Sequence, residues 1–208
     1  MPRPSVRHLI VESALRVLHG KGFHASSVQD ITEAAGVPKG SFYNHFKSKE
    51  ELAVEILDIY GKESRIDLLF AGEKPPLARL RSHFEFVAER LKRGDFDAGC
   101  LLGNFSVEMA DSVPAMRKAL GEALVGWTEA VASVLRQAQA EGDLDPSADA
   151  VRLARFLINA WEGAVARTRV TRDAVPFDDF FVLMFGFLLV PAPEVRGKAA
   201  KAKAPPAR

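Results

Sequence analysis

The 208-residue sequence predicts an all-α protein. Apolar residues recur at three- and four-residue steps along most of the chain, as they do on the buried face of a helix. No segment of useful length alternates apolar and polar residues in the manner of a strand. Glycine and proline interrupt the helical pattern where helices usually end or begin, as at Gly36, Pro114 and Gly142. We expect about nine helices, with a small three-helix domain over residues 1–50 and a larger helical domain over 51–192.

The first two helices are bounded by recognisable end signals. The first is expected from about Ser5 to His19, and the glycines of residues 20–22 end it. The second follows Ser27, whose side chain can cap it, with Asp30 three residues later as in a capping box. Gly36 ends this helix, because glycine readily adopts the left-handed C-cap conformation. The inward-facing residues are expected to be Leu9, Ile10, Ala14 and Val17 on the first helix and Val28, Ile31, Ala34 and Ala35 on the second.

A short third helix is expected from Pro38 to about Phe46. Phe42 and Phe46 are four residues apart and point inward together, whereas Gly40 and Asn44 face the opposite way. A helix of this length is a rod of roughly 12–14 Å, about what the major groove of DNA admits. Two short helices joined by a glycine turn therefore predict a helix-turn-helix. The alternative is a helical hairpin used only for packing, with Tyr43 in the core and His45 in solvent.

The run DITEAAGVPKGSFYNHFKSKEEL resembles the N-terminal DNA-binding domain of TetR-type transcriptional repressors. It has the Ala-Gly-Val turn, the Lys-Gly-Ser opening, the Tyr-x-His-Phe core and the Ser-Lys-Glu-x-Leu continuation, within residues 7–55. Thr32 and Pro38 depart from the family pattern, and Pro38 can neither cap the third helix nor contact phosphate as a serine there could. The resemblance implies phosphate contacts by Ser27, Tyr43, His45 and Lys49, and base contacts by Gln29, Lys39, Gly40, Ser41 and Asn44.

The remaining helices are predicted from the same signals, namely capping residues and the glycine and proline residues at helix ends. A new helix capped by Ser48 is expected to continue to about Phe70, and residues 72–76 form the clearest linker. The sequence then predicts helices over residues 77–93, 100–110, 114–141, 147–172 and 177–190. Residues 193–208 are basic, low in complexity and proline-ended, so we expect a disordered tail.

The last predicted helix is apolar around most of its circumference, which requires burial on more than one side. The resemblance implies a homodimer whose last two long helices form a four-helix interface, here residues 147–172 and 177–190. A two-fold dimer reads two half-sites about 34–36 Å apart, or a multiple of that distance, on a palindromic operator. The alternative is that Phe180, Phe181 and Phe185 fill a core within one chain.

Charge divides the chain into regions. Residues 1–50 hold seven basic and four acidic residues, residues 196–208 hold five basic and no acidic residues, and residues 51–195 hold 16 basic and 23 acidic residues. The two ends can therefore meet phosphate while the middle repels it. A single cysteine excludes an intrachain disulfide. No apolar run is long enough to span a membrane and no signal peptide is apparent, so we expect a cytoplasmic protein.

The resemblance also implies a small-molecule inducer that binds among the central helices and separates the DNA-binding units. Candidate pocket walls are Phe84, Cys100, Phe105, Met109, Trp127, Phe156 and Trp161, although aromatic residues at helical spacing also build cores. Cys100 opens a short helix, and a thiol at a helix N-terminus can have a lowered pKa and react with oxidants or electrophiles. The alternatives are therefore a redox- or electrophile-sensing repressor acting through Cys100, or a buried inert thiol.

Two other function classes stand beside a ligand-responsive repressor. The sequence has no HExxH, no GxSxG, no phosphate-binding glycine loop and no cysteine or histidine cluster at metal spacing, so we expect no catalytic residues, metal or cofactor. His83 is isolated within a predicted helix. A ligand-independent DNA-binding protein would carry the same helix-turn-helix, but it would show no inducer-dependent loss of binding.

Overall fold

The computed structural model describes residues 5–192, and within this range every regular element is a helix. The all-α prediction is therefore confirmed. The predicted tail over residues 193–208 lies outside the described residues, as do residues 1–4. The elements are α1 (Val6–Lys21), α2 (Val28–Ala34), α3 (Gly40–Tyr43), α4 (Lys49–Glu63), η1 (Ile66–Leu69), α5 (Pro76–Arg93), α6 (Leu101–Glu108), α7 (Pro114–Glu141), α8 (Ala150–Thr171), α9 (Val175–Leu183) and η2 (Met184–Leu188).

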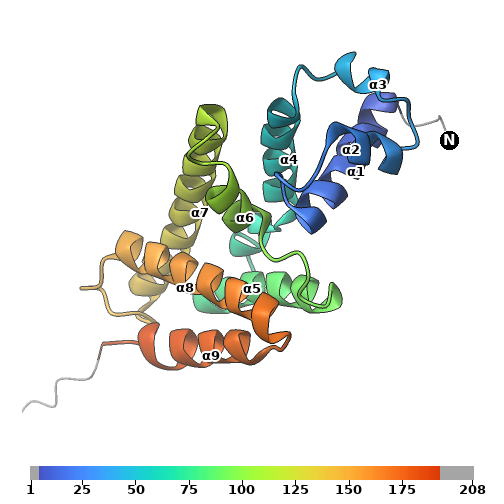
Figure 1. Cartoon of the computed structure of the whole chain (residues 1–208). Helices are drawn as coiled ribbons and strands as arrows, with labels where there is room; N and C mark the ends of the chain where they lie inside the picture. Colours follow the sequence, from blue (N-terminus) through green and yellow to red (C-terminus); the bar gives the residue numbers. More distant parts are fainter. Residues whose placement is uncertain (1–4, 193–208) are drawn as a thin grey trace, which may run out of the picture.

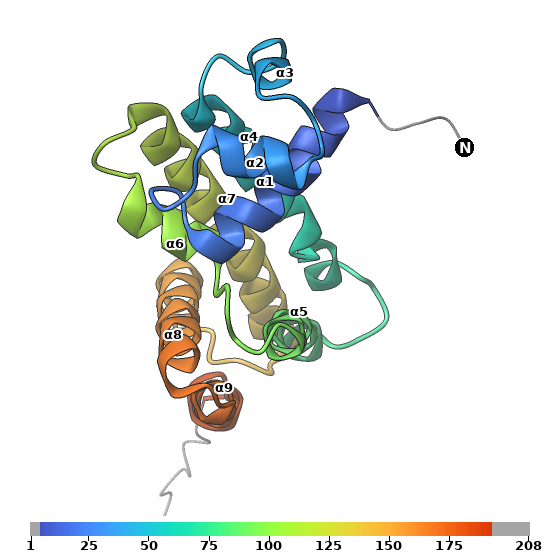
Figure 2. The ribbon, with the colours of Figure 1, turned by 45° about the vertical axis from the view of Figure 1, so that its right-hand side comes forward.

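The helices form two units joined by α4. Figures 1 and 2 show α1, α2 and α3 gathered at one end of the molecule and α5, α8 and α9 at the other end, while the long helix α7 runs from beside α4 toward α8 and α9. We call these the three-helix unit (α1–α3) and the C-terminal unit (α5–α9). Helix α4 packs against both α1 and α7. A shift of α4 would therefore change the packing of both the three-helix unit and the C-terminal unit.

Local caps position the helices of the three-helix unit. The Ser5 hydroxyl accepts a hydrogen bond from the His8 N–H at the start of α1. Ser27 and Asp30 form the predicted capping box on α2, and Gly36 follows that helix with a φ of +64°. The predicted inner face of α2 was wrong at Ala34, which is exposed. Thr32 is buried instead, because the buried face follows residues 28, 31, 32 and 35, and its hydroxyl is satisfied by donating to the Val28 carbonyl.

Two predicted helix boundaries in the first half of the chain differ from the structure. Helix α3 is regular only over Gly40–Tyr43, although hydrogen bonds from the Ser41 N–H to the Pro38 carbonyl and from the Phe46 N–H to the Phe42 carbonyl extend the turn. Helix α4 ends at Glu63 rather than near Phe70, because Arg65 adopts the left-handed conformation with a φ of +56° and a 3₁₀ turn follows.

The C-terminal helices are also shorter than predicted. Helix α8 begins at Ala150 rather than Ser147, because the Asp149 carboxylate caps it by accepting from two backbone N–H groups. The Ser147 hydroxyl instead donates to Asp145 in the preceding turn. Helix α9 ends at Leu183 and continues as a π-helical turn over Met184–Leu188. In contrast, the bounds predicted for α7, Pro114–Glu141, are confirmed.

An aromatic cluster forms the centre of the C-terminal unit. Trp161 on α8 stacks on Phe177 with ring centroids 4.9 Å apart, and its ring centroid lies 5.1 Å from that of Phe84 on α5. Phe180 on α9 contacts both Phe84 and Trp161. These side chains are buried within one chain. Within residues 5–192, no helix combines the length and the apolar character needed to cross a bilayer.

Candidate DNA-binding surface and ligand cavity

The α2–α3 region presents most of the predicted DNA-contacting residues to solvent. Tyr43 is 58% exposed, so the alternative that it belongs to the core is wrong. Phe42 and Phe46 are buried and attach α3 to the unit, as predicted. Ser41 is half-buried, and the exposed residues of the predicted set are Ser27, Gln29, Lys39, Gly40, Tyr43, Asn44 and His45. The structure therefore leaves this surface available, while the DNA contacts themselves stay a prediction.

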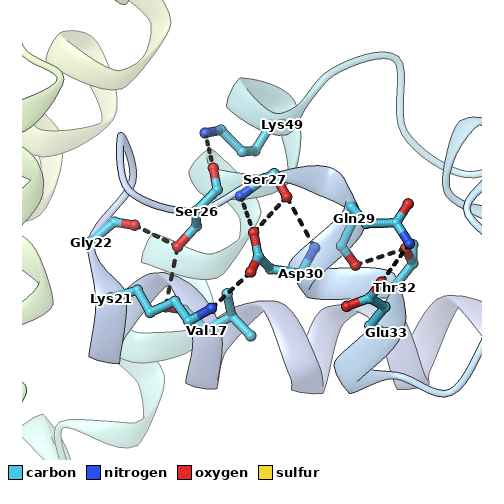
Figure 3. Close-up of polar contacts among 10 residues, drawn as sticks. All are labelled: Val17, Lys21, Gly22, Ser26, Ser27, Gln29, Asp30, Thr32, Glu33 and Lys49. Carbon is cyan, nitrogen blue, oxygen red and sulfur yellow. Dashed lines mark hydrogen bonds and ion pairs between the residues drawn. The ribbon is translucent and has the colours of Figure 1, made fainter.

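Ser27 is fixed at the start of α2 by a polar network, shown in Figure 3. Asp30 accepts from the Ser27 N–H at 2.8 Å and from the Lys21 ammonium group at 2.7 Å, while its own N–H donates to the Ser27 hydroxyl. The hydrogen bond from Lys21, followed by those from Ser27, holds the pKa of Asp30 well below its usual range. The network keeps Asp30 ionised and orients the first turn of α2. In the same first turn, the Gln29 side-chain amide donates to the Glu33 carboxylate, one turn further along α2, at 2.7 Å.

Lys49 has an intramolecular role that the sequence reasoning missed. Its ammonium group donates to the carbonyl oxygens of Phe23 at 2.8 Å and Ser26 at 2.6 Å. It also lies 4.0 Å from the centroid of the Phe23 ring. Figure 3 shows its side chain reaching the Ser26 carbonyl from α4. Lys49 therefore attaches α4 to the loop between α1 and α2. Its contact with a DNA phosphate stays a prediction.

A cavity of about 570 Å³ lies beside α4 in the C-terminal unit. Its walls come from α4, η1, α5 and α7, together with Cys100, Leu102 and Trp161. On α7 the wall comprises the small residues Ala119, Ala123 and Gly126, together with Glu122 and Trp127. The larger apolar wall residues are Val54, Leu57, Ile66, Val87 and Leu102.

Three of the predicted pocket residues line this cavity, namely Cys100, Trp127 and Trp161. Phe84, Phe105 and Met109 do not line this cavity, because they are fully buried in the core. Phe156 does not line it either, because its side chain is 53% exposed on the outer face of α8. The cavity is also lined by three residues of α4 and α5 that were not among the predicted ones, namely Tyr60, His83 and Arg90. Val54, Leu57 and Gly61 recur at three- and four-residue steps along α4, and this spacing is the sequence signal for the face that lines the cavity.

Burial suppresses charge on the inner wall. It lowers the pKa of His83 to about 4, and the His83 Nδ1 atom lies 3.4 Å from the Arg65 carbonyl. Burial, followed by the nearby Glu162 carboxylate, raises the pKa of the Cys100 thiol to about 12. The predicted lowering of the Cys100 pKa by the helix N-terminus was therefore wrong, because desolvation outweighs it. Burial also raises the pKa of Glu162. The cavity thus meets a thiol rather than a thiolate.

The three-helix unit touches the C-terminal unit next to this cavity. The His19 Nε2 atom lies 2.8 Å from the Gly99 carbonyl, and since a carbonyl only accepts, Nε2 carries the proton. The His24 N–H donates to the Glu108 carboxylate at 3.0 Å, and the His24 ring contacts the Glu108 carbonyl at 2.8 Å. The His19 ring also packs edge-on against Tyr60, with centroids 5.2 Å apart. Tyr60, which lines the cavity, therefore contacts the three-helix unit directly through His19.

The outer face of α8, α9 and η2 exposes large apolar side chains. Phe187 is 72% exposed, and Phe156, Val182 and Leu183 are also exposed. Phe177 and Phe180 are buried within the chain, so for Phe180 the intrachain alternative is confirmed. Phe181 and Phe185 are half-buried and stack on each other beneath Arg81. The face is therefore only partly covered by the chain itself, as a contact surface for a second chain would be.

Comparison with known proteins gives consistent matches over nearly the whole chain. The family described as "Bacterial regulatory proteins, tetR family" matches residues 10–56, and that described as "Tetracyclin repressor-like, C-terminal domain" matches residues 76–184. The chain is 35% identical over 192 residues to the HTH-type transcriptional repressor DhaR of Mycobacterium sp. strain GP1, covering 91% of this chain and 95% of that one.

Two further proteins, one of them a solved structure, are similar to this chain over most of its length. The transcriptional regulator AcuR of Cereibacter sphaeroides is 34% identical over 183 residues, covering 86% of this chain and 84% of the relative. A solved structure, the regulatory protein TetR from Rhodobacter sphaeroides, superposes with a TM-score of 0.80 at 32% identity. This superposition covers 85% of this chain and 95% of the solved one.

Proposed function

We propose a ligand-responsive repressor, because the chain belongs to the TetR family of DNA-binding transcriptional repressors, which are not enzymes. In this proposal the protein binds a palindromic operator as a homodimer, and it dissociates from the operator when a small molecule occupies the cavity. The observation that carries this proposal is the double contact of Tyr60. Its side chain lines the cavity and also packs against His19 of the three-helix unit. A ligand in the cavity therefore acts on a residue that helps to hold the DNA-binding surface in place.

DNA recognition is assigned to the exposed surface of α2 and α3. Tyr43, His45 and Ser27 contact phosphates, which fixes the position of the protein on the duplex without reading sequence. Base edges in the major groove are read by Lys39, Ser41 and Asn44, with Gln29 and Gly40 close to the groove. Lys49 is a weaker candidate than these residues, since its ammonium group already donates to two carbonyls.

Dimerisation is assigned to α8 and α9 with η2, within the predicted ranges 147–172 and 177–190. The exposed apolar residues Phe156, Val182 and Phe187 support this assignment, because burying them against a second copy removes them from water. The dimer matters for function since one short helix contacts few base pairs. Two copies at a fixed spacing select a site that one copy would not.

Release requires that the ligand prefer a conformation in which the two DNA-binding surfaces no longer match successive grooves. Helix α4 is suited to transmit this change, because Val54, Leu57 and Tyr60 face the cavity while Lys49 is bonded to the α1–α2 loop. We retain the division into domains 1–50 and 51–192, with α4 shared between them. A repressor acts on the chromosome, so we propose a cytoplasmic location.

The proposal is tested by selecting operators from random duplexes with the full chain and measuring binding by fluorescence anisotropy. The expected site is a palindrome, and its affinity falls steeply with salt because phosphate contacts release counterions. Tyr43→Ala weakens binding to all duplexes, whereas the matched control Lys118→Ala, at an exposed position of α7, leaves it unchanged. Selection of no palindrome, or equal binding by Tyr43→Ala, would refute the assignment.

Direct sensing through Cys100 is the second candidate, because Cys100 lines the cavity beside Glu162. Its raised pKa works against this function, since the thiolate is the reactive form. Alkylating the chain at Cys100 and measuring operator affinity separates the two candidates. Unchanged affinity removes the sensor function and leaves reversible ligand binding as the proposed signal. A third possibility, ligand-independent DNA binding, predicts that no compound found to occupy the cavity changes operator affinity.

A further inference from the structure

The basic side chains on the cavity wall differ in their ion pairing. Lys62 and Arg90 both line the cavity. The Lys62 ammonium group lies 2.5 Å from the Asp58 carboxylate, and both side chains are exposed. In contrast, within residues 5–192 no carboxylate oxygen lies within 4 Å of the Arg90 guanidinium group. Its one protein hydrogen bond is a long one, from Nη1 to the Glu63 carbonyl at 3.4 Å.

Arg90 is also held in a definite place. It is half-buried in the last turn of α5, and its Cζ atom lies 4.7 Å from the centroid of the Tyr60 ring. A guanidinium group stays protonated and carries five N–H donors, of which this contact with Glu63 uses one. The Tyr60 ring face and one long hydrogen bond only partly compensate this half-buried charge, and a carboxylate is the partner whose geometry fits a guanidinium group best.

The acidic residues on the cavity wall do not offer that partner. Asp58 is paired with Lys62, and Glu122 lies 3.9 Å from Lys118 on the exposed face of α7. The rest of the wall is mainly apolar, and His83 is uncharged at neutral pH because burial lowers its pKa to about 4. The cavity therefore combines a space of about 570 Å³, apolar walls and one cation without an acidic partner among the described residues.

We propose that the cavity binds a small apolar carboxylic acid as its anion, with the carboxylate on Arg90 and the hydrocarbon or aromatic part against Leu57, Val87 and Ala123. This inference rests on the proposed ligand-binding function and specifies its chemistry. It also suggests how the signal reaches DNA, because Arg90 lies over Tyr60, and Tyr60 contacts His19. A carboxylate that draws Arg90 toward the cavity changes the packing at this junction.

Ligand binding can be followed without DNA. Both tryptophans of the chain, Trp127 and Trp161, line the cavity, so intrinsic fluorescence reports its occupancy. The probes are decanoate and 4-phenylbutyrate, each compared with its neutral primary amide. We expect each acid to bind about tenfold more tightly than its amide, as for a charge-assisted hydrogen bond.

The variants identify the group responsible. Arg90→Gln abolishes the preference for acid while still binding the amide, which shows that the variant is folded. Arg90→Lys retains part of the preference, and the matched control Lys92→Gln, at an exposed position of α5 outside the cavity wall, retains all of it. Amides that bind as tightly as the acids, acids that do not bind at millimolar concentrations, or an acid preference that survives Arg90→Gln would each overturn the inference.

Operator affinity is measured separately, so that the two proposals can fail independently. If the acids bind through Arg90 and operator affinity is unchanged, the ligand class stands and the proposed induction fails. If a neutral compound occupies the cavity and releases the operator while the acids do neither, the induction stands and the ligand class is wrong.

Discussion

Replacing Lys49 by methionine is expected to destabilise the protein without removing a phosphate contact. Methionine keeps the apolar stem but leaves the carbonyls of Phe23 and Ser26 without the ammonium donor that lies 2.8 and 2.6 Å away. It also removes the cation lying 4.0 Å from the Phe23 ring centroid. The loop between α1 and α2 then loses its polar attachment to α4.

The size of the effect follows from these three contacts. Each hydrogen bond at this half-buried position contributes about 1 kcal/mol, and the cation–π contact adds about 0.5 kcal/mol, giving a loss of about 2–3 kcal/mol. Urea unfolding at fixed protein concentration measures this loss, because the stability of the proposed dimer depends on concentration. Lys47→Met is the matched control: Lys47 is exposed, and its replacement should change the free energy of unfolding by less than about 0.5 kcal/mol.

DNA binding by the same variant distinguishes the structural role from the predicted phosphate contact. The slope of log affinity against log salt falls by about 0.9 for each phosphate that the protein no longer neutralises. If Lys49 acts within the protein, the Lys49→Met slope equals that of the unmodified chain. A reduced slope together with an unchanged free energy of unfolding would refute the structural role.

Substitutions at four other positions have defined outcomes. Ser27→Ala removes the α2 cap and should lower the free energy of unfolding by about 1 kcal/mol, whereas Ser27→Gly costs only a few tenths. The His83 pKa is lowered from 6.5 to about 4 in the folded chain, so its contribution to stability is complete above pH 6.5 and is lost as the pH falls toward 4. His83→Gln should therefore flatten the dependence of unfolding free energy on pH across that window by about 3 kcal/mol at most; an unchanged slope would show that His19 or another group causes it. Phe187→Glu should shift the sedimentation coefficient toward that of a monomer without loss of helical circular dichroism. Asn44→Ala should cost about 1–3 kcal/mol of discrimination at one operator position, and uniform weakening at all positions would contradict its place in the groove.

The three-helix unit was predictable because its signals are local. The Ser27–Asp30 capping box, the left-handed Gly36 and the inward pair Phe42 and Phe46 each depend on residues within one or two turns. The end of α4 was not predictable in this way. Arg65 adopts a left-handed conformation that an arginine in a sequence does not indicate, and the helical pattern continues past it.

The cavity was harder to predict for a geometrical reason. Periodicity shows which face of a helix turns inward, but it does not distinguish a side chain packed in the core from one at the edge of a space. Trp161 and Phe84 are equally buried and 5.1 Å apart, yet only Trp161 lines the cavity. The position of Arg90 on the cavity wall was not indicated by the sequence, since a basic residue in the last turn of a helix usually interacts with the helix dipole.

The small residues of α7 suggest how the specificity of this cavity could be redesigned. A Cβ atom added at Gly126 would meet no heavy atom within 4 Å, so alanine fits there without a steric clash. Such a residue shortens the space available to a ligand, and Ala119 and Ala123 lie on the same wall. All three belong to α7, whereas the contacts of Tyr60 with Arg90 and His19 join α4 to α5 and α1. Substitutions on α7 can thus change which compound fits the cavity, while the contacts through which we propose that ligand binding reaches the three-helix unit stay unchanged.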